Sequence, residues 1–190
     1  MTSLPELHRS ALEATGRIVH GIGAAQLDAP TPCEGMDVRA LLDHVIGGNR
    51  WVAPLVDGQT IEQVGDRLDG DQVGDDPAAS YDASAAEAAA AFERPGAMEA
   101  PVAVSYGPVP GEVYAGHRFV DVLVHGWDLA VATGQDRTLD PGLVAACWDV
   151  VRPQQDLLRA SGMFGDEVPV AGDADEQTKL LAVLGRRADQ

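Results

Sequence analysis

The sequence is poor in cysteine and contains no long hydrophobic run. Only two of its 190 residues are cysteines, Cys33 and Cys147, and they lie far apart with no CxxC pair. We therefore expect reduced thiols in a cytoplasmic protein rather than a disulfide framework. No run approaches the roughly 20 apolar residues that a membrane helix needs, and the polar–apolar start of the chain is unlike a secretory signal. A hydrophobic content of 45% is still enough for one folded core.

Basic residues are also scarce. The chain has 13 Lys and Arg against 30 Asp and Glu, which gives a net charge of −17. Such a charge repels phosphate backbones and anionic membrane surfaces, so neither nucleic acids nor membranes are expected as partners. A glycine-rich phosphate loop is missing as well, because Gly21-Ile-Gly23 lacks the flanking pattern of a dinucleotide site.

One segment places polar residues at helical spacing among apolar ones: His117-Arg-Phe-Val-Asp121-Val-Leu-Val-His125-Gly-Trp-Asp128. On a helix, its two histidines and two aspartates fall within one stripe, while the rest of the surface is mostly apolar. Unpaired polar groups are costly in an apolar interior, so this stripe needs partners. A metal ion would satisfy several of these groups together, and an internal hydrogen-bond network is the alternative.

A complete metal site requires a ligand from a second helix. Asp121 and His125 are one turn apart and can converge on one ion, whereas His117 is two turns from His125. Asp37 is the expected N-cap of a helix that follows a breaker-rich segment. His44 lies on the flank of its apolar face and can point along the seam between two packed helices, although a partly exposed histidine is the alternative. This apolar face consists of Val38, Leu41, Leu42, Val45 and Ile46.

Two of these segments resemble a known family. They are Pro30-Thr-Pro-Cys-Glu-Gly-Met-Asp-Val-Arg-Ala-Leu-Leu-Asp-His44 and Asp121-Val-Leu-Val-His125-Gly-Trp-Asp-Leu-Ala130. Together they resemble the mycothiol-dependent maleylpyruvate isomerase N-terminal domain family, which belongs to the DinB-like four-helix metal proteins. The ending, from Glu167 to Gly185, is similar to the short actinobacterial branch of that family. The resemblance therefore spans nearly the whole chain.

The resemblance implies a set of metal ligands. The family's second-helix histidine matches His44, its acidic ligand matches Asp121, and its following histidine matches His125. The isomerase typically has Glu at the acidic position, so with the shorter Asp the ion has to sit closer to the fourth helix. Two imidazoles and one carboxylate leave coordination positions open. Zinc is the expected ion, with nickel, iron and manganese as alternatives, because these donors suit several divalent metals.

Further residues are expected near this site. Asp128 or His117 is expected to orient a metal ligand by a hydrogen bond from behind. Trp51 and Tyr114 are expected to line a pocket at the open face of the metal, with ordinary core packing as the alternative. Cys33 is expected to be a packed loop residue rather than a ligand.

The expected fold is mainly α. The helical pattern and the resemblance together predict a single domain, with a DinB-like four-helix bundle at about 1–135 and a short C-terminal helical extension at about 136–190. Residues 56–80, rich in Asp and Gly, are expected to form an exposed crossover loop, and residues 97–111 an extended, turn-like segment. Helices are expected at about 3–24, 37–55, 78–95, 112–133, 140–161 and 174–184.

The resemblance also implies a function. We expect a divalent-metal protein that activates mycothiol, as an S-transferase or an isomerase, with a small-molecule thiol and an electrophile as partners. A homodimer is left open. Much of the isomerase's second domain is expected to be missing, which favours thiol transfer over isomerisation of maleylpyruvate. The alternatives are a metal-dependent binding or sensor protein without turnover, and a metal-dependent hydrolase.

Overall fold

The computed structural model describes residues 2–105, 107–155 and 165–188. The chain divides into two compact units, Met1–Gln135 and Asp136–Gln190. Both units are built mainly from helices, which agrees with the mainly α fold expected from the sequence. No described helix is long and apolar enough to cross a lipid bilayer.

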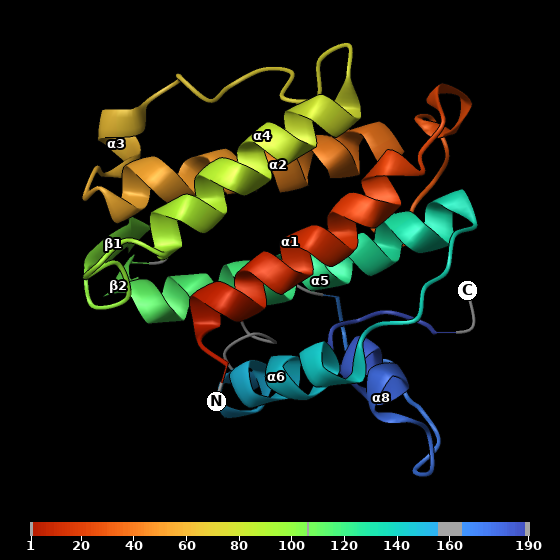
Figure 1. Ribbon diagram of the computed structural model, residues 1–190. Helices are drawn as coiled ribbons and strands as arrows, with labels where there is room; N and C mark the ends of the chain where they lie inside the picture. Colours follow the sequence, from red (N-terminus) through yellow and green to blue (C-terminus); the bar gives the residue numbers. More distant parts are fainter. Residues whose placement is uncertain (1, 106, 156–164, 189–190) are drawn as a thin grey trace. The chain divides into compact units, whose positions relative to one another are not determined.

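Four long helices form the first unit: α1 (Leu4–His20), α2 (Val38–Val56), α4 (Pro77–Phe92) and α5 (Gly111–Thr133). Helix α1 packs on α5 and α2 packs on α4, while contacts of α1 with α4 and of α2 with α5 close the bundle. Figure 1 shows α1 and α5 running in one direction and α2 and α4 in the other. Because α2 and α4 are parallel, the chain has to return along the bundle between them.

Local sequence sets where these helices begin and end. Ser3 and Glu6 form a capping box at the start of α1. The side chains of Asp37 and Asp76 accept backbone N–H groups at the starts of α2 and α4. At the end of α5, Gly134 adopts a left-handed conformation with φ of 67°, which glycine takes without steric cost. The N-cap role of Asp37 is as expected from the sequence.

The first helix is shorter than the sequence suggested. Helix α1 ends at His20 rather than near residue 24. Gly21 and Gly23 follow it, and glycine is a poor helix former. Residues Ala24–Gln26 form a separate 3-10 turn, η1. The connection between α1 and α2 is therefore longer than expected, and it carries Cys33.

The crossover at residues 57–76 is only partly an exposed loop, which corrects the sequence expectation. It contains a one-turn helix, α3 (Ile61–Val64), and it buries Val73 completely. The backbone N–H of Gln72 donates to Asp43 Oδ1 at 2.6 Å. This bond and the burial of Val73 hold the crossover against α2.

A short hairpin leads into α5. Strands β1 (Pro101–Val104) and β2 (Gly107–Pro110) pair antiparallel, which gives the extended segment expected near 97–111. The N–H of Gly111 donates to the carbonyl of Ala100 at 2.8 Å, so the hairpin fixes the start of the helix. A Cβ on Gly111 would overlap the carbonyl oxygen of Ala97, so the close approach there requires glycine.

The hydrophobic core of the first unit lies between the four helices. Burial of these apolar side chains is the main favourable term for folding, at about 25 cal/mol per Å². It holds α2 and α5 side by side, and these are the helices that carry the expected metal ligands. The largest fully buried side chains of this unit are Leu41, Leu42, Ile46, Tyr81, Phe92, Phe119, Leu123, Trp127 and Leu129.

The second unit contains α6 (Pro141–Val151), the 3-10 turn η2 (Arg152–Gln154) and α8 (Glu176–Val183). Helix α6 stops before Pro153, as expected where proline interrupts a helix, and the rest of the predicted helix, from residue 156 on, lies outside the described residues. The final helix falls within the predicted range. Buried side chains of α6 and α8 include Val144, Cys147, Leu180 and Leu181.

Candidate metal centre

The structure brings together the three residues expected to ligate a metal. His44 comes from α2, and Asp121 and His125 come from α5. Each offers a ligand atom, and these atoms lie within 4.8 Å of one another. The Nε2 atom of His44 is 3.5 Å from Asp121 Oδ1, and Nε2 of His125 is 3.4 Å from the same oxygen. Both imidazoles therefore face a single carboxylate oxygen.

Helix geometry explains this convergence. Asp121 and His125 are four residues apart and share one face of α5. His44 reaches them from the neighbouring helix, and its ring meets that of His125 edge to face, with centroids 4.9 Å apart. The side chains of His44, Asp121 and His125 are 43%, 21% and 10% exposed. The group is thus open to solvent on the α2 side and closed on the α5 side.

A buried arginine holds the other oxygen of the carboxylate. Arg118 Nη1 lies 2.8 Å from Asp121 Oδ2, and Arg118 Nη2 donates to Asn49 Oδ1 at 3.0 Å. The Asn49 side chain in turn donates to the hydroxyl of Ser84 at 3.2 Å. A Cβ on Gly48 would overlap the guanidinium, so glycine makes room for it against α2. The chain of hydrogen bonds connects α4, α2 and α5 to the candidate ligands.

The second ring nitrogen of His125 faces a different pair of residues. Asp128 is fully buried, and its Oδ2 lies 3.0 Å from His125 Nδ1. The thiol of Cys33 donates to the same Asp128 oxygen at 3.1 Å, and its sulfur lies 3.6 Å from His125 Nδ1. Asp128 thus contacts a candidate ligand on the side of the ring opposite Asp121, and its orienting role stays a prediction.

Cys33 is a partly buried residue of the loop before α2, and it makes a contact that the sequence did not suggest. The loop folds back over α5 and places the thiol at His125. Cys33 and His125 are 92 positions apart in the chain, so helical spacing could not reveal the contact. In the sequence, Cys33 lies in the same family motif, Pro30 to His44, as one of the candidate ligands, and this is the signal that could have indicated the contact.

Two pKa shifts follow from this arrangement. Burial alone would raise the pKa of the Asp121 carboxyl, but Arg118 and His125 lower it well below its usual range. Burial alone would lower the pKa of His125, but the charge of Asp121 and hydrogen bonds to Asp121, Asp128 and Cys33 raise it well above its usual range. In the metal-free protein these two residues therefore form an ion pair at neutral pH.

Three other expected site residues lie outside the donor group. His117 is half-buried on α5 and belongs to neither of the two groups of potential ligands found among the described residues. The ring of Tyr114 is buried and packs against Phe92, with centroids 5.6 Å apart. Trp51 packs partly buried against the same hydrophobic cluster. An orienting role for His117 and a pocket role for Trp51 and Tyr114 stay predictions.

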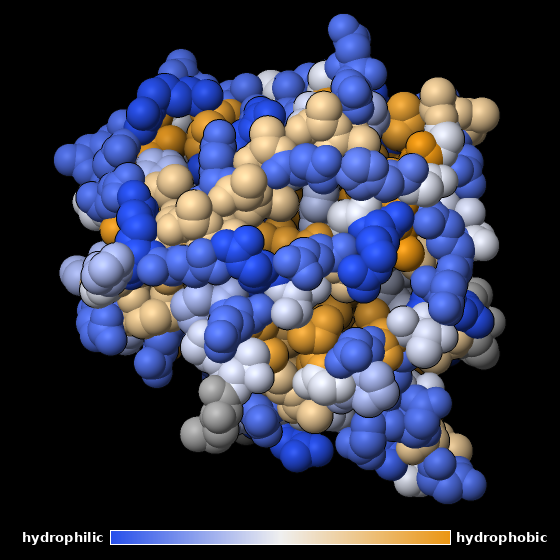
Figure 2. Space-filling model, in the orientation of Figure 1, coloured by the Kyte–Doolittle hydropathy of each residue, from blue (hydrophilic) through white to orange (hydrophobic). Residues whose placement is uncertain are grey.

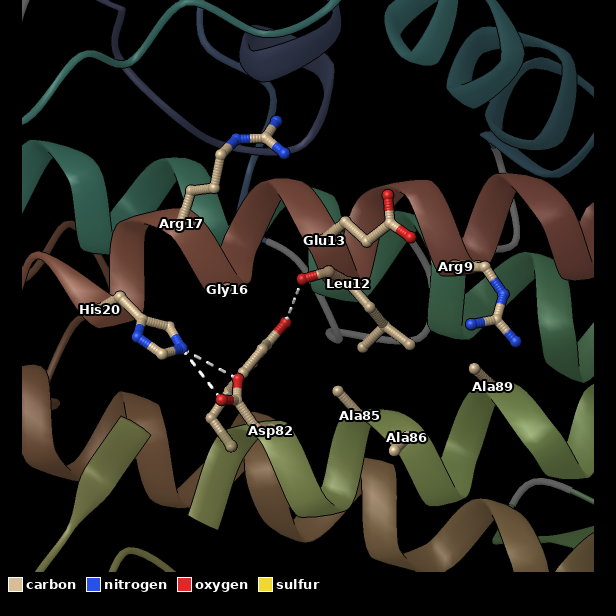
Figure 3. Close-up of a pocket in the computed structure, with 11 residues that line it drawn as sticks. Arg9, Leu12, Glu13, Gly16, Arg17, His20, Asp82, Ala85, Ala86 and Ala89 are labelled. Atoms are coloured by element: carbon tan, nitrogen blue, oxygen red, sulfur yellow. Dashed lines mark hydrogen bonds and ion pairs between the residues drawn. The ribbon is translucent and has the colours of Figure 1, made fainter. Parts of the chain in front are cut away.

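A separate surface groove lies between α1 and α4. Figure 3 shows His20 and Asp82 pointing toward one another across it, with the Nε2 and Oδ2 atoms 3.0 Å apart. Alanines of α4 form part of its lining, and Figure 2 shows this weakly hydrophobic surface beside the hydrophilic surface of α1. None of the three candidate ligands lines the groove.

Comparisons with solved structures identify the fold. A mutant of the mycothiol-dependent maleylpyruvate isomerase superposes with a TM-score of 0.71 at 16% identity, over 100% of this chain and 94% of that chain. Another crystal structure of the mycothiol-dependent maleylpyruvate isomerase gives a TM-score of 0.61 at 16% identity, over 83% of this chain and 72% of that chain. This chain covers 94% of the first structure and 72% of the second, so the expectation that much of the isomerase's second domain is missing stays a prediction.

Sequence comparisons identify the family. Uncharacterised proteins from two strains of Mycobacterium tuberculosis, H37Rv and CDC 1551 / Oshkosh, are each 38% identical over 188 residues, covering 94% of this chain and 95% of the relative. The family model described as the mycothiol maleylpyruvate isomerase N-terminal domain matches residues 8–130. The match covers α2, most of α5 with both of its candidate ligands, and more than half of the chain. The chain therefore belongs to the mycothiol maleylpyruvate isomerase N-terminal domain family.

Proposed function

We propose that this chain binds one divalent metal ion through His44, Asp121 and His125 and uses it to activate the thiol of mycothiol. The class of reaction is transfer of the thiol to an electrophile, or an isomerisation that proceeds through such an addition. The observation that carries the proposal is the approach of both Nε2 atoms to Asp121 Oδ1, at 3.5 and 3.4 Å. Mycothiol is the thiol named by the family to which the chain belongs.

The donor set fits a divalent ion. Nitrogen and oxygen ligands about 2.0–2.2 Å from a tetrahedral ion are separated by roughly 3.3–3.6 Å. The Nε2–Oδ1 distances here already have that value. The chemistry of the set favours zinc, with nickel, iron and manganese as alternatives. Three protein ligands leave a position open on the side where His44 is exposed.

The surrounding residues prepare the ligands for this role. When bound, the ion acts as a Lewis acid that favours the thiolate form of an incoming thiol at neutral pH. Arg118 holds Oδ2 of Asp121, which keeps Oδ1 turned toward the imidazoles. Asp128 accepts the Nδ1 proton of His125, so that Nε2 of the neutral ring carries the lone pair that ligates.

The proposal is tested by an assay of the metal-loaded protein with mycothiol and a general electrophile. We expect thiol consumption that is abolished by His125→Ala and retained by His20→Ala. His20 is a matched control because it is a histidine paired with an aspartate outside the donor group. Release of acid without thiol consumption would indicate a hydrolase instead. Metal binding without any turnover would indicate a binding or sensor protein.

A further inference from the structure

A second group of potential metal ligands lies on the other side of the His125 ring. It consists of Cys33 Sγ, His125 Nδ1 and Asp128 Oδ2. The Sγ–Oδ2, Nδ1–Oδ2 and Sγ–Nδ1 distances are 3.1, 3.0 and 3.6 Å. His125 and Asp128 are buried, whereas Cys33 is partly exposed and provides a route of access from solvent. These atoms are distinct from those that form the first site.

The spacing of this group suits a cation. With zinc–sulfur bonds of about 2.3 Å and zinc–nitrogen or zinc–oxygen bonds of about 2.0–2.2 Å, tetrahedral ligands lie roughly 3.3–3.7 Å apart. Movements of a few tenths of an ångström would bring the three atoms to that spacing. Two of the three donors, the Asp128 carboxylate and the Cys33 thiolate, are anionic in the bound state, and thiolate sulfur selects thiophilic ions.

The loop that carries Cys33 is held in place before any ion binds. The hydroxyl of Thr31 accepts the N–H of Cys33 at 3.1 Å and donates to the carbonyl of Met36 at 2.8 Å. Pro30 and Asp37 form a β-bridge at the base of the same loop. Little chain ordering is therefore needed to present the thiol to His125.

We propose that Cys33, His125 and Asp128 form a second cation position, which takes a thiophilic divalent ion such as zinc. Binding displaces the thiol proton of Cys33 and the Nδ1 proton of His125 to water. This inference rests on the proposed function in one respect: when the first site is also filled, the ring of His125 bridges the two ions as an imidazolate. Asp128 and the Cys33 thiolate then balance the charge of the second ion.

The alternative is that Cys33 and Asp128 only orient His125 through hydrogen bonds. Cobalt(II) titration of the full chain separates the two cases, because a thiolate ligand gives a near-ultraviolet charge-transfer band that nitrogen and oxygen ligands do not. We expect wild type to bind two equivalents, with the band present. Cys33→Ser should bind one equivalent without the band, and His44→Ala should bind one equivalent with it. Cys147→Ser is the matched control, because Cys147 is fully buried and outside both groups.

The outcomes distinguish the inference from the proposed function. If wild type binds one equivalent of cobalt and shows no thiolate charge-transfer band, the second position is overturned and the first still stands. If wild type binds one equivalent with the band, and the band is still present in His44→Ala, the second position is supported and the first is contradicted. A band that persists in Cys33→Ser would overturn the assignment of the sulfur ligand.

A measurement on wild type alone keeps the inference testable if the Cys33 variant does not fold. Cys33 is the more exposed of the two cysteines, so iodoacetamide should react there. With zinc at about ten times its dissociation constant, alkylation should slow about tenfold, because only about a tenth of the sites stay empty. The same protection is expected in His44→Ala. An alkylation rate that zinc leaves unchanged would overturn the inference.

Discussion

Arg118 and Asp121 form a partly buried ion pair that leaves one oxygen of the carboxylate facing two histidines. Arg118 Nη1 lies 2.8 Å from Oδ2, while Oδ1 faces the Nε2 atoms of His44 and His125. The arginine also binds Asn49, so it is fixed from both α2 and α5. The carboxylate is thereby held with Oδ1 toward both imidazoles, which is the orientation that the proposed metal ligand needs.

The first prediction concerns the stability of this pair. Arg118→Met should destabilise the metal-free protein by about 3 kcal/mol, the lower end of the range for buried pairs, because it leaves a carboxylate that is only 21% exposed without its main partner. Arg9→Met removes a guanidinium from an exposed pair with Glu93 and should cost no more than about 1 kcal/mol. Urea unfolding in the presence of a chelator measures both. Equal losses in the two variants would contradict the account.

The sequence predicted the helices of the site well because the signals are local. Periodicity and the Asp37 cap placed the second helix at about 37–55, and the structure has Val38–Val56. The stripe of histidines and aspartates identified the helix that became Gly111–Thr133. The resemblance then paired His44 with that stripe, which no spacing within one helix could do.

Other parts of the site depend on tertiary structure. Arg118 lies three residues before Asp121, and this spacing allows an ion pair on one helix face. The sequence pattern of polar residues four apart indicated His117 instead of Arg118. The approach of Cys33 depends on how the loop before α2 folds over α5. Contacts between residues so distant in sequence are set by the packing of the whole unit.

A second prediction concerns acid stability. His8 is fully buried, its ring packs edge to face on Phe92, and neither ring nitrogen has a hydrogen-bond partner among the described residues. Burial, with smaller contributions from Arg118 and Arg9, lowers the pKa of His8 to about 3. Between that value and the unfolded pKa of about 6.5, only the unfolded chain binds the proton, so stability falls as the pH falls.

His8→Leu should remove this dependence. At pH 4, wild type should have lost roughly 3 kcal/mol more of its pH 7 stability than the variant, at about 1.4 kcal/mol per pH unit below 6.5. Urea unfolding at pH 7, 5 and 4 with a chelator present checks the difference. Parallel pH dependences in the two proteins would show that His8 is not buried neutral.

A third prediction links metal binding to protons. In the metal-free protein the raised pKa of His125 keeps its imidazole protonated at pH 7, and a metal can bind only the neutral ring. Binding at the site formed by His44, Asp121 and His125, measured in Cys33→Ser, should therefore release about one proton from this residue, and affinity should fall as the pH falls. Calorimetric heats of zinc binding should differ between two buffers with different ionisation enthalpies.

The same linkage predicts that the thermal midpoints with and without metal converge in acid and separate as the pH rises. Two results together would argue against the histidine ligands: binding heats that are identical in both buffers, and a difference between the thermal midpoints with and without metal that does not change with pH.

A fourth prediction concerns the contact between α1 and α5 beside the site. A Cβ on Gly126 would overlap the hydroxyl of Thr15, which donates to the carbonyl of Val122 at 3.0 Å. Gly126→Ala should destabilise the protein by about 1–3 kcal/mol, because the two helices must separate. The same change should cost less in a Thr15→Ala background, where two of the three nearest atoms are gone.

Gly172→Ala serves as the control for this series. Nothing lies within 4 Å of a Cβ at Gly172, so the substitution should change stability by no more than about 0.5 kcal/mol. Equal costs of Gly126→Ala in both backgrounds would show that Thr15 does not limit the approach of the helices.

The central claim is that His44, Asp121 and His125 hold one divalent ion, and zinc stoichiometry tests it most directly. The measurement is elemental analysis after dialysis in a Cys33→Ser background, which excludes the thiol position. That protein should retain about one zinc per chain. Adding His44→Ala, Asp121→Ala or His125→Ala should lower retention by about tenfold or more, while adding His20→Ala should leave it unchanged. Near-stoichiometric zinc in all three ligand variants would contradict the assignment.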